Sequence, residues 1–424
     1  MEVLVGVVLT FGAGLGVTVA ALVAGRRSLA AMWLEAGRAA GLSRLQVRTR
    51  AGWPMCVEGS RGPLTVRIRS LYIREVAETA TLLEVRGVTS RIALIPVTLA
   101  SRVARERDVR IGDAAFDEAI VVTGDEAVAA AVLDGRTREL IRELFAPRIV
   151  TEFPRVEADR GRLDPGCLVV ERMLGNQAVW LASYLEGVLT LAERLREPSD
   201  LASRLLANVQ EDTDASVRLT NLRLLLREPD SQARRTALQK AVGDVDEDVR
   251  LEAAIELGAS GRPALLRIAT DARAGDTCAA RAIETLRSAF PADQAGTVLA
   301  QALGNRRLRT AAACIESLGR RGPDQAEAIG RVLAVEHGEL ARVAARALGR
   351  VGAAPAIVLL HEAVERLPRD RALREAATEA TVAIRARLVG AGEGQVSLAG
   401  DEPGRVSLAR DEAGRVSVPT GDAE

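Results

Sequence analysis

Two carboxylates in the first half of the chain are of a type that could do acid–base or metal chemistry. Asp113 and Asp117 lie four residues apart and offer oxygens for proton transfer or for a bound cation. The favoured interpretation is structural: Asp113 caps a turn, Phe116 fills the core, and Asp125 caps the next helix. No histidine and no set of Ser, His and Asp in this region supports hydrolysis.

The thiols and imidazoles of the chain are few and far apart. The wide cysteine spacing fits neither a zinc site nor a dense disulfide pattern, so free thiols are expected. The four cysteines of the chain are Cys56, Cys167, Cys278 and Cys314. Cys278 and Cys314 fall on predicted apolar helix faces, and His337 and His361 have no clustered partners. The sequence therefore predicts no catalytic residue, no metal site, no cofactor and no enzymatic activity.

Composition indicates what kind of core must position these residues. Apolar residues make up 48% of the 424 residues but aromatic residues only 2%, which favours closely packed helices. The 57 basic and 57 acidic side chains cancel, which argues against binding nucleic acid along the whole chain. The length allows at least two cores.

An apolar segment at the amino terminus predicts a membrane anchor. The 23 residues from Val3 to Gly25 carry no charge and would span about 34 Å as a helix, enough for a bilayer. Arg26 and Arg27 follow at once, which places the bulk of the chain in the cytoplasm by the positive-inside rule. We therefore expect a single-pass inner-membrane protein. A cleaved signal peptide is the alternative, although no basic region precedes the segment.

Glycines inside this segment allow two interpretations. Gly12, Gly14 and Gly16 resemble the start of a dinucleotide-binding loop, but the third glycine of that motif is replaced by Val17. Gly12 and Gly16 also form GxxxG, through which two membrane helices could pack.

The stretch that follows the anchor is basic. Between Arg26 and Arg110 there are 16 Arg against seven Asp and Glu, a charge that could bind anionic lipid headgroups or fix the topology.

A change of hydrophobic period predicts a small α+β domain. In five segments, apolar residues either alternate with polar ones or form a short continuous run, as they do in β-strands. They are Leu64–Ile68, Thr81–Val85, Ile92–Val97, Ala119–Val122 and Cys167–Val170. Helices are expected over Asp125–Phe145 and Gln177–Arg196. The string IGDAAFDEAIVVTGDE, Ile111 to Glu126, resembles a GD-x-AFD element of membrane-anchored bacterial proteins, which carries no known activity.

Helical repeats account for the second half of the chain. The second helix of each unit can be aligned at intervals of 29 to 32 residues, which predicts an α-solenoid. The aligned positions are Leu225, Leu257, Leu286, Leu318, Leu348 and Ala380. In DEDVRLEAAIELG an aspartate caps the helix, Val249 and Ala253 are in the apolar stripe, and Gly258 permits the left-handed turn. The third unit departs from this pattern, with Arg287 where others have Gly.

These units resemble HEAT-like repeats of the short, Ala-rich type found in phycobiliprotein lyases. The resemblance implies a scaffold that binds a protein through its second helices, and a lyase-like activity is the alternative that the repeat type implies. Positive charge on those helices could face an acidic partner or pair with neighbouring repeats. The residues are Arg218, Arg250, Arg342, Arg346 and Arg350.

The carboxyl-terminal residues form a third kind of sequence. Three copies of a ten-residue string begin at Gly394, Gly404 and Gly414, and the stretch lacks the apolar residues needed for a core. The expected fold is mainly α, with five parts. They are a transmembrane anchor over 1–27, a juxtamembrane helix over 28–44, an α+β domain over 45–196, a HEAT-like α-solenoid over 197–388 and a disordered tail over 389–424. The expected function is a membrane-anchored, non-catalytic adaptor, with a lyase-like enzyme or an anionic-lipid-binding protein as alternatives.

Overall fold

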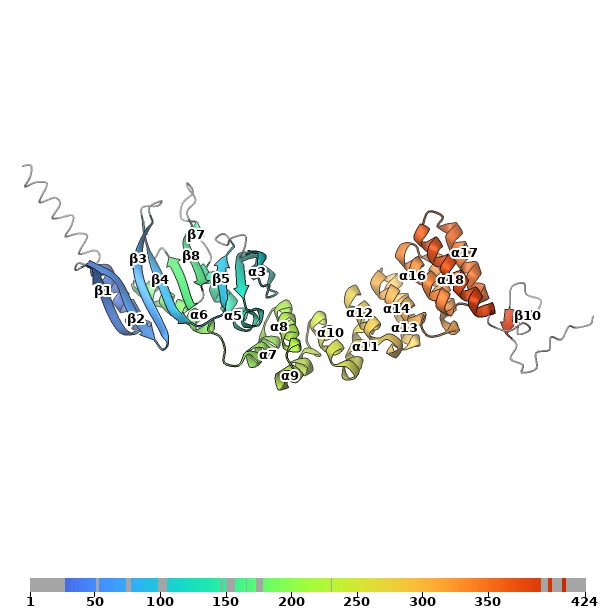
Figure 1. The fold of residues 1–424 in the computed structure, drawn as a ribbon, viewed down its shortest axis with the longest axis horizontal. Coiled ribbons are helices and arrows are strands. Elements are labelled where there is room, and N and C mark those ends of the chain that lie inside the picture. The colour runs from blue at the N-terminus through green and yellow to red at the C-terminus, as the bar shows by residue number, and fades with distance from the viewer. Residues whose placement is uncertain are drawn as a thin grey trace, which may run out of the picture. The chain divides into compact units, whose positions relative to one another are not determined.

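The computed structural model divides the chain into two compact units, one ending at Ala241 and the other beginning at Val242 (Figure 1). It describes residues 27–50, 53–73, 78–97, 105–145, 148–149, 157–164, 166–172, 178–229, 231–389, 396–398 and 406–408. The predicted membrane segment, with Gly12 and Gly16, lies outside these residues. Within the described part of the chain, no helix combines the length and apolarity needed to span a bilayer.

An antiparallel sheet forms the centre of the first unit. Its strands follow the order β1-β2-β3-β4-β9-β8-β5-β6, and β7 pairs with β8. The strands are β1 Ser43–Arg50, β2 Trp53–Arg61, β3 Leu64–Ile73, β4 Glu78–Val88, β5 Ile92–Pro96, β6 Ile120–Gly124, β7 Arg148–Ile149, β8 Glu157–Asp164 and β9 Gly166–Arg172. The five segments predicted as strands coincide with parts of β3, β4, β5, β6 and β9, except that Val97 follows β5 and Ala119 belongs to the helix before β6.

Alternation gives the sheet one apolar and one polar face. Leu64, Val66 and Ile68 of β3 point into the core, and Arg67 and Arg69 point to the other face. On that face the guanidinium of Arg67 pairs with Glu58 of β2 at 2.8 Å, and that of Arg69 pairs with Glu84 of β4 at 3.0 Å.

Two of the helices that contribute to the apolar core of this sheet come before its first strand and after its last one. The first covers residues 27–39 and contributes Trp33 and Ala36 to the core. The second, α6 (Ala178–Arg194), contributes Leu181, Leu185 and Val188. The segment expected as a separate juxtamembrane helix over 28–44 is thus part of the domain core, and β1 already begins at Ser43.

The helix predicted over Asp125–Phe145 is two helices, which corrects the expectation. The first is α4 (Glu126–Val132) and the second is α5 (Gly135–Phe145). The break occurs because Asp134 caps α5, accepting a hydrogen bond of 2.9 Å from the backbone N–H of Thr137. A short helix that was not predicted, α3 (Ala114–Ala119), precedes β6.

Three further helices belong to the first unit. They are α7 (Leu201–Glu211), α8 (Ala215–Arg227) and α9 (Gln232–Ala241). Helix α4 contacts both α7 and α8, and α7 contacts α8 and α9. The sequence placed the domain boundary between residues 196 and 197, whereas the compact unit continues to Ala241 because of these contacts.

The second unit is a stack of paired helices. Its helices are α10 Glu247–Glu256, α11 Arg262–Thr270, α12 Asp276–Leu286, α13 Ala292–Gly304, α14 Leu308–Leu318, α15 Ala326–Val335, α16 Gly338–Val351, α17 Ala354–Arg366 and α18 Arg371–Val389, with short 3-10 turns at Gly258–Gly261, Arg287–Ala289 and Pro323–Gln325. Each even-numbered helix from α10 to α16 contacts the next even-numbered one (Figure 1). The aligned repeat positions of this unit all lie in these helices or directly follow them.

Small side chains let the stacked helices approach closely. Ala311, Ala344 and Ala347 are fully buried between them. A Cβ on Gly349 of α16 would lie 2.8 Å from Cα of Ala380 in α18, so this glycine is required by the close approach of two helices. Gly258 instead has a φ of +54°, which confirms the predicted left-handed turn.

Charged side chains join consecutive layers at both ends of their helices. Glu247 of α10 accepts a hydrogen bond from the backbone N–H of Gly275, which caps α12, at 2.8 Å. Asp276 of α12 likewise accepts from the N–H of Thr310 in α14 at 2.8 Å. At the opposite end, Arg387 of α18 donates to the carbonyl of Gly349 at 2.7 Å. Each layer thus satisfies helix-terminal groups of a neighbour.

The described part of the tail is a pair of short strands. Strand β10 (Val396–Leu398) pairs antiparallel with β11 (Val406–Leu408). These are the VSL triplets of two consecutive ten-residue copies. The tail was expected to be disordered; most of it lies outside the described residues.

Candidate functional site

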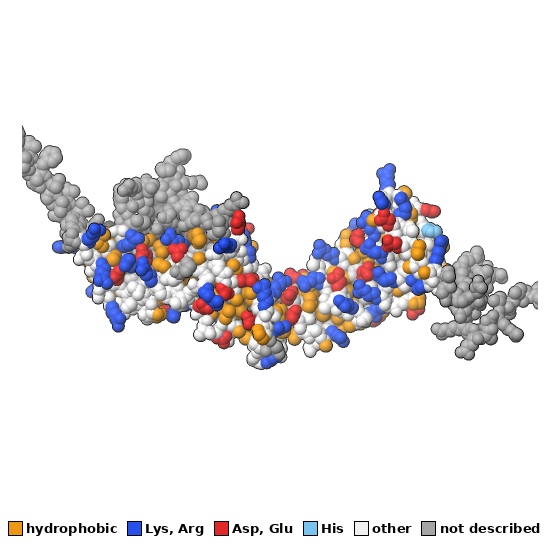
Figure 2. Space-filling view, viewed as in Figure 1, with side chains coloured by type: hydrophobic (Ala, Val, Ile, Leu, Met, Phe, Trp, Pro, Cys, Tyr) orange, Lys and Arg blue, Asp and Glu red, His pale blue; other side chains and the backbone are white. Residues whose placement is uncertain are grey.

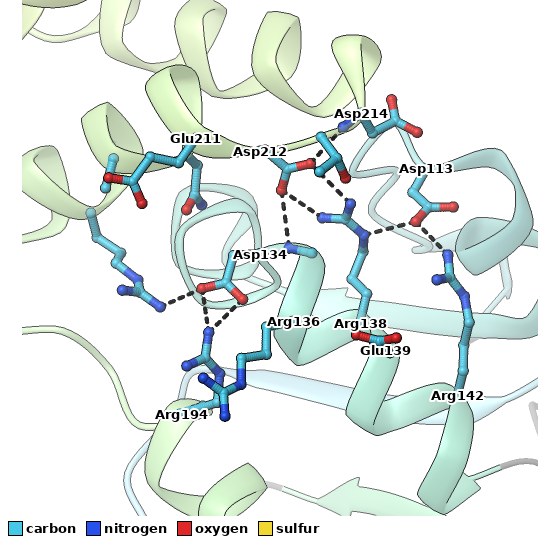
Figure 3. Close-up of a pocket in the computed structure, with 15 residues that line it drawn as sticks. Asp113, Asp134, Arg136, Arg138, Glu139, Arg142, Arg194, Glu211, Asp212 and Asp214 are labelled. Carbon is cyan, nitrogen blue, oxygen red and sulfur yellow. Dashed lines mark hydrogen bonds and ion pairs between the residues drawn. The ribbon is translucent and has the colours of Figure 1, made fainter.

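An open cavity of about 890 Å³ in the first unit is lined mainly by charged side chains (Figure 3). Five arginines and six Asp or Glu residues contribute to its walls. The side chains come from α5, α6 and α7, from the turn before α3 and from the α7–α8 loop. Among these residues, only Asp113 is a candidate on the sequence alone.

Arg138 is the centre of the first cluster in this ionic cavity. Its side chain is 3% exposed, and its Nε donates to Asp113 at 2.8 Å. Its two terminal nitrogens donate to the two oxygens of Asp212 at 2.9 and 3.0 Å, a bidentate pair. The carboxylate of Asp212 is fully buried, and Arg142 makes a second ion pair with Asp113. This one guanidinium joins three segments of the unit: α5, the turn before α3 and the α7–α8 loop.

Asp134 is the centre of the second cluster. It accepts hydrogen bonds from Arg194 of α6 at 2.6 Å and from Arg204 of α7 at 2.5 Å. It also accepts from the hydroxyl of Thr137 at 2.9 Å. Nearby, the buried amide of Asn208 donates to the carbonyl of Ala130 at 2.8 Å, so α7 is also bonded directly to α4. The break between α4 and α5 therefore anchors two later helices.

The hydrogen bonds keep these groups ionised. Burial by itself would raise the pKa of Asp113, but the N–H of Phe116 and the guanidiniums of Arg142 and Arg138 together hold it below the usual value. Asp134 has a lowered pKa for the same reason, since its bonds outweigh the effect of burial. Burial would lower the pKa of Arg138, but the hydrogen bonds that it donates to Asp212 and Asp113 raise it. Carboxylates held in this way are poor proton donors and acceptors near neutral pH.

The predicted structural roles in the GD-x-AFD string are confirmed. Asp113 caps α3, accepting from the N–H of Phe116 at 3.0 Å, and Phe116 is fully buried. Asp125 caps α4 through the N–H groups of Ala127 and Val128. Asp117 accepts from two backbone N–H groups and does not line the cavity; burial raises its pKa. The string therefore builds the turn that carries Asp113 to Arg138.

The structure does not bring the candidate thiols and histidines together. Cys278 lies on α12 with its sulfur 2.9 Å from Asp248, and Cys314 is fully buried on α14. Burial raises the pKa of both thiols to about 12. His337 precedes α16 and His361 lies on α17. Among the residues described, no group of three or more Cys, His, Asp or Glu is arranged to hold a metal ion.

We expect these two thiols to resist alkylation in the folded protein. At pH 8 a thiol with a pKa near 12 has so little thiolate that iodoacetamide should modify Cys278 and Cys314 at least about a hundredfold more slowly than an unperturbed cysteine. Mass spectrometry of tryptic peptides after timed labelling measures this. The chain unfolded in urea is the control, and modification of Cys278 at the unfolded rate would contradict the expectation.

The five arginines predicted to face a partner all make contacts within the chain. Arg218 and Arg250 each donate to a backbone carbonyl of the loop before their own helix, at 2.9 and 2.8 Å. Arg342 pairs with Asp370 at 3.2 Å. Arg346 pairs with Glu339 at 3.0 Å, and Arg350 pairs with Glu316 at 2.7 Å. The last three remain partly exposed.

Comparison of the chain with protein-family models, with curated proteins and with solved structures finds no match.

Proposed function

We propose that the protein is a membrane-anchored, non-catalytic adaptor whose second half, an α-solenoid of HEAT-like repeats, binds a protein partner. The observation that carries the proposal is the side-by-side packing of the even-numbered helices α10 to α18. Most of their apolar residues are buried within the stack, and outward positions carry polar side chains such as Thr285 and Arg346. Charged side chains of both signs lie on the visible face of this unit (Figure 2). A repeated surface of this kind is the usual binding surface of solenoid proteins.

The ionic cavity supports a structural interpretation of the first unit. Its central arginine and the carboxylates around it are paired with one another. In this proposal the first unit is a rigid base near the membrane anchor. Protease accessibility in intact cells and in spheroplasts tests the proposed cytoplasmic location.

Site-specific photo-crosslinking in cells tests the adaptor proposal. A photoreactive residue at Thr285 of α12 or Arg346 of α16 is expected to form a discrete crosslink to another protein. Thr297 of α13 and Val358 of α17 are the matched controls, since both are exposed on odd-numbered helices. Crosslinks from all four positions alike, or from none, would count against a specific binding surface on the even-numbered helices.

A further inference from the structure

One helix end in the second unit departs from its repeat. The helices α10, α14 and α16 carry Leu-Gly near their ends, whereas α12 carries Leu286 followed by Arg287. Arg287 has a φ of +49°, close to the +54° of Gly258 at the equivalent position. The left-handed region is unfavourable for a residue with a Cβ. An arginine kept in a conformation suited to glycine is a reason to examine its surroundings for a function.

Arg287 lines an open groove of about 670 Å³ between α12 and α14. Arg320 lines the same groove, 3.8 Å from Glu316, which is too far for a hydrogen bond. Glu316 is bonded instead to Arg350 at 2.7 Å. Within the described part of the chain, the side chain of Arg287 makes no hydrogen bond or ion pair. The α12–α14 groove thus contains two guanidiniums with donors to spare.

The wall of the groove also contains a buried hydroxyl group. Ser317 of α14 is 4% exposed, and its Oγ has no hydrogen-bond partner among the described residues. Buried hydroxyl groups are normally hydrogen-bonded, because an unmade bond is unfavourable. The apolar side chains of Ile283 and Ala313 lie beside it. This hydroxyl is closed off from solvent, so the groove offers a partner the two arginines and the apolar lining.

We propose that the α12–α14 groove binds a short segment of a partner protein that carries a single Asp or Glu beside an apolar side chain. Arg287 and Arg320 donate to the carboxylate. Glu284 and Glu316 line the same groove, so a doubly charged phosphate or a run of acidic residues is disfavoured. The inference rests on the proposed adaptor function and names the chemistry of its partner.

Selection of peptides on the full-length chain tests the proposal. The probe is a phage library of random dodecapeptides, followed by fluorescence anisotropy with the enriched peptides. We expect enrichment of peptides with one Asp or Glu, and a loss of binding of at least about tenfold when that residue becomes Asn or Gln. Arg287→Gly should weaken binding by a similar factor.

Arg287→Gly separates binding from folding. It restores the residue used by the other repeats, so the thermal midpoint should stay equal or rise while binding is lost. Arg281→Ala, on the same helix but outside the groove, is the matched control and should leave binding unchanged. Peptides whose binding does not depend on Arg287 would overturn the proposal. So would a tenfold gain in affinity on truncation after Leu388, since the chain's own acidic tail would then occupy the groove.

The two proposals fail in different ways. Suppose that Thr285 and Arg346 give crosslinks, the control positions do not, and no peptide depends on Arg287 for binding. This result would contradict the groove proposal but not the adaptor proposal. Peptide binding at the groove without crosslinks in cells would contradict the adaptor proposal. The groove would then bind peptides in vitro without a partner protein in the cell.

Discussion

Replacing Arg138 with methionine is expected to destabilise the first unit by about 3–5 kcal/mol. The substitution keeps an apolar stem of similar length but removes the cation that both Asp113 and Asp212 share. The Asp212 carboxylate is fully buried, so it would lose the guanidinium that pairs with both its oxygens. All three tryptophans, Trp33, Trp53 and Trp180, lie in this unit, so their fluorescence during urea unfolding measures its stability.

Arg136→Met is the matched control for this substitution. Arg136 lines the same cavity, but it is exposed and makes no hydrogen bond or ion pair with the residues that the structure describes. Its loss should change stability by less than about 0.5 kcal/mol. Equal effects of the two substitutions would show that the cluster around Arg138 does not join the segments of the unit.

Acid should weaken the same clusters. In the unfolded chain, Asp113 and Asp134 titrate near pH 4, and in the folded chain their pKa values are lower. Their contribution to stability is therefore complete above about pH 4 and is lost as the pH falls through the folded pKa values. Arg138→Met should reduce this acid dependence, because it removes one of the bonds that lower the pKa of Asp113.

Gly349→Ala is expected to destabilise the second unit by about 2 kcal/mol, although alanine favours helices. The added methyl group would lie 2.8 Å from Cα and 2.9 Å from Cβ of Ala380, so α16 and α18 must separate. The contact is with backbone, which cannot rotate away. Far-UV circular dichroism during thermal unfolding measures the loss, and tryptophan fluorescence of the first unit serves as an internal reference.

Gly296→Ala provides the control within the same stack. Gly296 lies inside α13, and an added methyl group would meet no other atom within 4 Å. Here only helix propensity changes, so a gain of about 1 kcal/mol is expected. A Gly349→Ala protein as stable as Gly296→Ala would contradict the close approach of α16 to α18.

The repeated half of the fold could be predicted because each unit uses the same local signals. Leu286, Leu318 and Leu348 recur at intervals of about 30 residues, and all three are buried in successive even-numbered helices of one stack. The sheet was harder to predict. Strand β1 was missed because it is an edge strand whose residues are almost all exposed, so it lacks the alternation that revealed β3.

The ionic cavity could be predicted only in part. The cap formed by Asp113 is local, since its acceptor atom and the N–H of Phe116 are three residues apart. The partners of Arg138 are 25 and 74 residues away, and nothing in one sequence pairs an arginine with a distant aspartate. Asp134 was included in a continuous predicted helix, which hid the capping role that places it between Arg194 and Arg204.

The hydrogen bonds between consecutive layers give the second unit a direction. Glu247 and Asp276 accept hydrogen bonds from the amino end of the even-numbered helix in the next layer. Arg387 donates to the carboxyl end of the even-numbered helix in the layer before. A duplicated layer would bring its own carboxylate and its own helix start, so tandem gene duplication can lengthen such an array without new compensating mutations. A duplication out of phase would leave one helix end without its partner, so inherited length changes should come in whole units.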